Sequence, residues 1–121
     1  MTTYSIRTNF KDYSQSIIDA YLLEDIINSF KPGVWDFLVL SPDKPVQNSI
    51  FLQVGAPDKS GDNKYVVEMV FKTSDNQYKM HRYYTDDKKL VLQYLTDYLE
   101  KQQVPDISGW DDVTHENPNF K

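Results

Sequence analysis

The fold of this chain is decided by residues 64–84, which read KYVVEMVFKTSDNQYKMHRYY. Apolar side chains recur at every second position around a short polar stretch, which is typical of two half-buried strands joined by a tight turn. If Asp75 and Asn76 are the two central turn residues, Glu68 lies opposite Tyr83. The stretch therefore predicts an antiparallel hairpin with one apolar face and one mixed face.

Two further strand-like runs precede this hairpin, at 35–40 and 49–55. The first is a short apolar run that ends at a segment with two prolines, and the second alternates along its length. A polar stretch at 58–63 has the composition of a turn. Together the runs predict four consecutive antiparallel strands, preceded by an irregular lead-in at 1–16.

Apolar residues at helical spacing predict two helices, over 17–30 and 90–99. The expected capping residues are Ser16 or Asp19 for the first helix and Thr85 or Asp86 for the second. The order of elements predicts an α+β fold, a four-stranded antiparallel meander sheet with an N-terminal and a C-terminal helix packed on one face (α-β-β-β-β-α). We expect a single domain, 1–121, that ends in an acidic C-terminal tail at 106–121.

The negative charge of the chain is concentrated near its end. The formal net charge is −5, and residues 97–121 hold six acids against two lysines, a net charge of −4. Nucleic-acid binding needs clustered Lys and Arg, and no basic cluster is present, so we expect no nucleic-acid partner. A basic protein partner is favoured by electrostatic steering. The alternative is that the acidic surface only keeps the protein soluble.

Targeting and membrane signals are missing from the sequence. No apolar run approaches the about 18 to 20 residues of a membrane span, and the first residues lack a signal-peptide profile. The chain has no cysteine, which fits a reducing compartment. We therefore expect a cytoplasmic protein without a membrane partner.

Candidate catalytic and metal-binding groups are scarce. His81 and His115 are the only histidines, and a metal site needs about three or four ligands. His81 near Glu68 would be the only nucleus, and a lone His–Glu contact is more often a surface hydrogen bond. The sequence contains neither a nucleophile elbow nor a phosphate-binding glycine loop. We expect no catalytic residue, no cofactor and no metal, and hence no enzyme.

Two surfaces are candidates for binding a partner protein. The first is the acidic tail, with a tryptophan as possible anchor: Asp106, Trp110, Asp111, Asp112 and Glu116. The second is the mixed face of the sheet, represented by Gln53, Glu68, His81 and Tyr83. Aromatic side chains among hydrogen-bonding groups are typical of interfaces. The alternatives are that the lead-in or the tail covers this face, and that the tryptophan fills the edge of the core.

Several short motifs carry a family resemblance. They are NSIFLQV at 48–54, YVVE at 65–68, Tyr83-Tyr84, the Val91, Tyr94, Leu95 and Tyr98 series, and GWDDV at 109–113. Over residues 34–114 the chain resembles the small bacterial immunity proteins of polymorphic toxin systems. The resemblance implies tight, stoichiometric inhibition of a cognate toxin, without catalysis.

The leading hypothesis is therefore an immunity protein that binds and neutralises a toxin domain as a monomer or weak homodimer, and the toxin domain is expected to be basic. The alternative is a self-associating structural or assembly subunit of phage or mobile-element origin. That subunit would associate through its sheet face or an edge strand, and a mass that rises with concentration would distinguish it.

Overall fold

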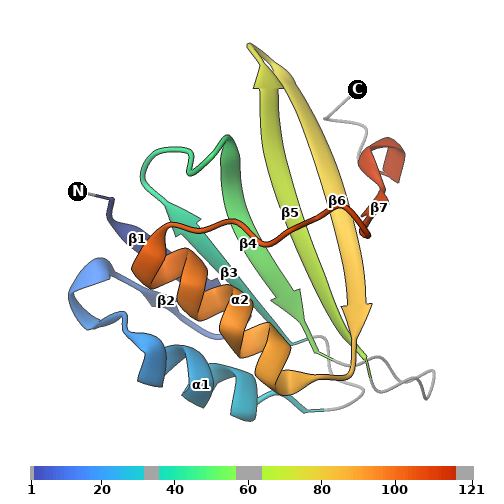
Figure 1. The fold of residues 1–121 in the computed structure, drawn as a ribbon. Coiled ribbons are helices and arrows are strands. Elements are labelled where there is room, and N and C mark those ends of the chain that lie inside the picture. The colour runs from blue at the N-terminus through green and yellow to red at the C-terminus, as the bar shows by residue number, and fades with distance from the viewer. Residues whose placement is uncertain (1, 32–35, 57–63, 117–121) are drawn as a thin grey trace.

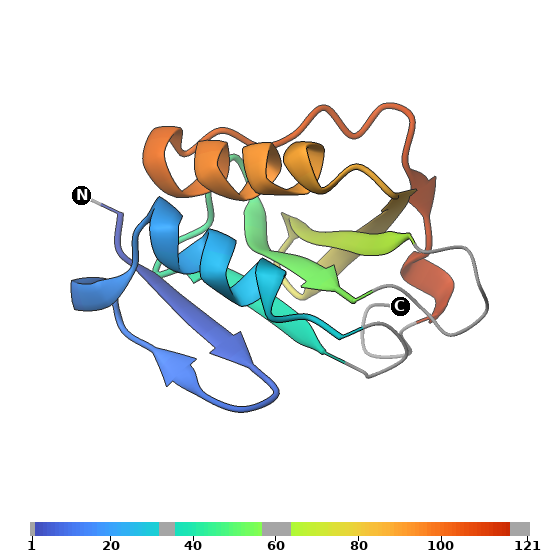
Figure 2. The same cartoon turned by 90° about the horizontal axis from the view of Figure 1, so that it is seen from below.

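The computed structural model describes residues 2–31, 36–56 and 64–116. These residues form a seven-stranded antiparallel sheet in the order β2-β1-β3-β4-β5-β6-β7, and both α-helices lie on one face of it (Figures 1 and 2). In chain order the elements are β1 (Tyr4–Thr8), β2 (Asp12–Tyr13), the 3-10 helix η1 (Gln15–Ile17), α1 (Ala20–Asn28), β3 (Phe37–Pro42), β4 (Ser49–Gly55), β5 (Tyr65–Ser74), β6 (Gln77–Thr85), α2 (Lys88–Lys101), β7 (Asp111–Asp112) and the 3-10 helix η2 (Thr114–Glu116).

The mixture of helices and strands agrees with the sequence, but the predicted four-stranded meander is wrong. The lead-in at 1–16 forms β1 and β2 instead of irregular chain, and the acidic tail contributes β7. β1 pairs with β3 over five positions, with Ile6 opposite Leu40. β2 and β7 are two residues long, too short for a period of two to be visible in sequence.

Helix α1 begins later than its apolar spacing indicated. Residues 15–17 form η1, and Asp19 caps α1 by accepting a hydrogen bond from the Leu22 amide at 2.9 Å. Asp19 is one of the two predicted caps. The turn expected at 58–63 and the first residue of the strand expected at 35–40 lie outside the described residues.

Helix α2 is capped by a residue that the sequence did not single out. Asp87 accepts from the Leu90 amide at 3.2 Å, so the predicted caps Thr85 and Asp86 are wrong. The Thr85 hydroxyl instead accepts from the Asp87 amide at 3.1 Å. The sequence alone does not identify the cap, because three residues able to cap a helix, Thr85, Asp86 and Asp87, follow one another.

The core lies between the helices and the apolar face of the sheet. Its largest fully buried side chain is Tyr98 of α2, whose hydroxyl lies 2.8 Å from the Ser49 hydroxyl. Tyr4 of β1 donates its own hydroxyl to the Tyr98 carbonyl. Burial raises the pKa of Tyr98 to about 12. These contacts join the first strand, the fourth strand and the second helix.

The predicted register of the β5–β6 hairpin is wrong by one residue. Ser74 pairs with Gln77 around the predicted turn, but the register shifts between Lys72 and Ser74. Thr73 is thus an extra residue on β5, as in a β-bulge. Beyond it Glu68 lies opposite Arg82, not Tyr83.

A shift of one residue moves every side chain of a strand to the other face. His81 and Tyr83 therefore share the helix-covered face with their partners Met69 and Val67. Arg82 takes their place on the opposite face, called the open face because neither α-helix covers it (Figures 1 and 2).

Candidate functional site

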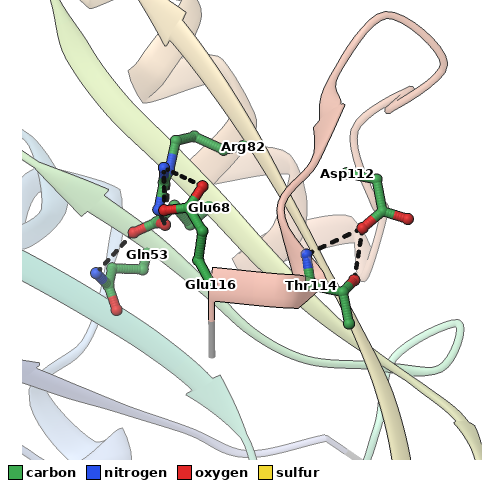
Figure 3. Close-up of polar contacts among 6 residues, drawn as sticks. All are labelled: Gln53, Glu68, Arg82, Asp112, Thr114 and Glu116. Atoms are coloured by element: carbon green, nitrogen blue, oxygen red, sulfur yellow. Dashed lines mark hydrogen bonds and ion pairs between the residues drawn. The ribbon is translucent and has the colours of Figure 1, made fainter. Parts of the chain in front are cut away.

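A row of polar side chains crosses the open face of the sheet (Figure 3). Gln53 of β4 is opposite Glu68 of β5, which is opposite Arg82 of β6. Directly opposed residues on neighbouring strands place their side chains within reach of one another. The Gln53 amide Nε2 donates to Glu68 Oε1 at 3.2 Å.

Arg82 joins this row to the C-terminal tail. Its Nε and Nη2 donate to Glu68 Oε2 at 2.9 and 2.8 Å, and its Nη1 donates to the two carboxylate oxygens of Glu116 at 3.0 and 3.2 Å. Partial burial lowers the pKa of Arg82, but the hydrogen bonds that it donates to Glu68 and Glu116 outweigh burial and raise the pKa above its ordinary value. The guanidinium is permanently charged and shared between two carboxylates.

The tail reaches this point through a short ladder on β6. The Val113 amide donates to the Met80 carbonyl at 2.8 Å, and the Met80 amide donates to the Thr114 hydroxyl at 2.9 Å. Asp112 Oδ1 accepts from the amide and hydroxyl of Thr114 at 3.0 and 2.6 Å (Figure 3). This local turn leads into η2, and the last residue of η2, Glu116, contacts Arg82.

The predicted tryptophan anchor lies on the opposite face. Trp110 is 8% exposed, and its ring stacks on Tyr83 with centroids 5.6 Å apart and an interplanar angle of 11°. The Tyr94 ring of α2 lies 5.8 Å from it. Trp110 and Tyr83 thus meet, but Trp110 belongs to the core and the partly buried Tyr83 packs against it, so little of the tryptophan is available to a partner.

His81 does not lie beside Glu68, because the two residues are on opposite faces of the sheet. The His81 ring meets Phe71 edge-on at a centroid distance of 5.8 Å. Its Nδ1 is buried and has no hydrogen-bond partner among the described residues. The predicted His81–Glu68 contact is therefore wrong.

All four predicted tail acids are exposed: Asp106, Asp111, Asp112 and Glu116. Hydrogen bonds from Ser108 lower the pKa of Asp106, and hydrogen bonds from Thr114 lower the pKa of Asp112. Both carboxylates are consequently ionised at neutral pH. Glu116 differs from them because its charge is already paired with Arg82.

Arg82 is the site residue that sequence reasoning missed. The signal that could have found it is Asn76, which adopts a left-handed conformation with φ of 67°. Asp75 does not have a positive φ, whereas a two-residue type I′ turn needs one at both central positions. In hairpins, a type I turn followed by a single left-handed residue is accompanied by a β-bulge. A bulge adds one residue to one strand, which is the register shift observed here.

A small cavity lies between the β1–β2 hairpin and the end of α1, with a volume of about 70 Å³. Asp36 in its wall accepts from the Asn9 side chain and from the Lys31 amide, both at 2.9 Å. The carboxylate is thus engaged in structural hydrogen bonds. Within the described residues, no group of three or more acids or histidines is placed to hold a metal ion.

None of the helices in the described part of the chain has both the length and the apolar character needed to cross a membrane. A scan with family models and searches of curated proteins and of solved structures find no match for this chain.

Proposed function

We propose that this chain is an immunity-type protein that binds a basic toxin domain one to one in the cytoplasm and neutralises it without catalysis. The proposal rests on the motif resemblance over residues 34–114 and on the acidic segment after α2. The binding surface would lie where that segment meets β6.

The observation that carries the proposal is the negative charge of the segment after α2, part of which pairs with β6. Asp106, Asp111 and Asp112 are exposed, and local turns hold two of them with lowered pKa values. Fixed, ionised carboxylates attract a basic partner over several ångströms and raise the rate of association. Exposed charges of this kind contribute more to association rate and specificity than to affinity.

A specific observation supports self-association as a second candidate. Three large apolar side chains in the first 21 residues are exposed: Phe10 at 84%, Tyr21 at 80% and Ile17. Exposed apolar side chains are enriched at contacts between proteins when they form a patch. A mass in solution that rises with protein concentration would favour this candidate over a monomeric inhibitor.

The test begins with a tagged pull-down from the native lysate at moderate salt, followed by mass spectrometry. The purified partner is then titrated with this chain while its own toxic activity is assayed. Loss of activity at a one-to-one ratio is the expected result. A partner that stays fully active when saturated, or recovery of only this chain, would reject the immunity role.

The surface is tested by the triple variant Asp106→Asn, Asp111→Asn, Asp112→Asn. We expect slower association and a weaker dependence of the association rate on salt. The matched control is Glu24→Gln, Asp25→Asn, Asp75→Asn, which changes the net charge equally at exposed acids elsewhere. Equal association rates for both triple variants would remove the tail from the binding surface.

A further inference from the structure

The donors of Arg82 are divided between two carboxylates with different surroundings. Nε and Nη2 go to Glu68, whose side chain is 10% exposed, and Nη1 goes to Glu116, whose side chain is 45% exposed. Glu68 is therefore the built-in counter-ion of Arg82. Glu116 is an outer ligand on the solvent side of the guanidinium.

The inner half of this arrangement does not depend on the tail. Glu68 lies within β5, and its second oxygen accepts from Gln53 of β4 at 3.2 Å. Two hydrogen bonds from Arg82 to one Glu68 oxygen fix the plane of the guanidinium. Arg82 would consequently keep its orientation if Glu116 moved away, and such preorganisation favours binding of a new ligand.

The outer half is held weakly. Glu116 ends the three-residue helix η2, and among the described residues its amide donates to the Val113 carbonyl alone, at 2.9 Å. A half-exposed ion pair gains little, because water screens it and holding the side chain in place costs conformational entropy. The Glu116 carboxylate can therefore exchange with another carboxylate.

We propose that Arg82 is a binding site for a carboxylate of an Asp or Glu side chain on a partner protein, and that Glu116 is its internal competitor. The occupant is chosen because an acidic side chain on a polypeptide turn is already seated there. The Arg82 side chain is 20% exposed on a sheet face, not enclosed in a cavity, which suits a protein partner. The site does not require that the partner be a toxin.

The experiment follows the Arg82 Nε–H signal by NMR in the full chain while N-acetyl-glutamate methylamide is added. In Glu116→Gln we expect a saturable shift of this signal. The wild-type chain should need about two- to fivefold more probe for half-saturation, because Glu116 competes at the strength of a partly exposed ion pair. His115→Ala, next to Glu116 and also exposed, should titrate like the wild type.

The neutral analogue N-acetyl-glutamine methylamide should leave the signal in place in every variant. Absence of a saturable shift in Glu116→Gln would overturn the carboxylate site. Equal half-saturation in Glu116→Gln and wild type would overturn the competitor role. If the amide spectrum of Glu116→Gln shows that its fold has changed, the titration is repeated with Glu116→Ala. No toxin takes part, so these outcomes are independent of the proposed function.

Discussion

The two segments that flank the central strands are attached to the sheet in different ways. β1 pairs with β3 over five positions and buries Tyr4 and Ile6 under the helices. In the described part of the acidic tail, β7 pairs with β6 at only two positions, and Glu116 forms an ion pair with Arg82. The N-terminal segment is thus held mainly by apolar burial, and residues 114–116 mainly by polar contacts.

This difference separates a permanent attachment from an exchangeable one. Apolar burial is lost only when the strand leaves the core, whereas a half-exposed ion pair can be replaced by water or another charge. The described tail has two buried apolar side chains, Trp110 and Val113, so its first part should stay in place when η2 moves. Among the described residues, the exchangeable part is therefore η2, which ends at Glu116.

The largest expected effect is on the N-terminal side. Ile6→Ala removes a fully buried side chain and should lower the free energy of unfolding by about 3 kcal/mol. Urea unfolding measures it, and Ser5→Ala, an exposed position on the same strand, should change stability by less than about 0.5 kcal/mol. Similar losses in both variants would show that β1 is not attached by burial.

A smaller loss is expected for Arg82→Met, about 2 kcal/mol, because Glu68 is left nearly buried without its cation. Adding Glu68→Gln removes the unpaired charge and should restore part of the stability, again measured by urea unfolding. A double variant less stable than Arg82→Met would contradict the assignment of Glu68 as the inner counter-ion.

Glu116→Gln should change stability by less than about 1 kcal/mol, since the ion pair is half exposed. The same unfolding experiment in low and high salt should show the difference shrinking with salt. A loss as large as that of Ile6→Ala would erase the distinction between the two flanking segments.

The smallest effect concerns pH. The pKa of Asp112 is lowered in the folded chain by its hydrogen bonds from Thr114, so its contribution to stability is fully present above the ordinary aspartate pKa. That contribution is lost as the pH falls through the lowered value. Unfolding curves of wild type and Asp112→Asn should therefore converge at acid pH, and a gap that widens there would contradict this sign.

Sequence periodicity was informative where elements are long. β5, β6 and both helices follow apolar repeats that their lengths make visible, and Asp19 was among the expected caps. β1 has only two buried side chains on alternate positions, a signal no stronger than chance in a polar segment. β2 and β7 are too short to show an apolar repeat. They are strands because they pair with β1 and β6.

The candidate site was predicted in part. Gln53, Glu68 and Glu116 were singled out, and the structure brings Glu68 and Glu116 to Arg82 and Gln53 to Glu68. His81 and Tyr83 were placed on the wrong face because the sequence does not show the extra residue, Thr73. This one residue moves every later paired side chain of β6 to the other face of the sheet. Trp110 was ambiguous because a tail tryptophan can anchor an interface but more often fills the edge of the core, where the structure places it.

Both outer strands of the described sheet are only two residues long, which bears on aggregation. A long unpaired strand edge is a template on which a second chain can add its own strand. β6 has nine residues, and β7 covers it only at His81 and Arg82. Detachment of the last turn would lengthen the free edge of β6, so the same Glu116–Arg82 contact that marks the exchangeable end also limits unwanted strand addition between copies of the chain.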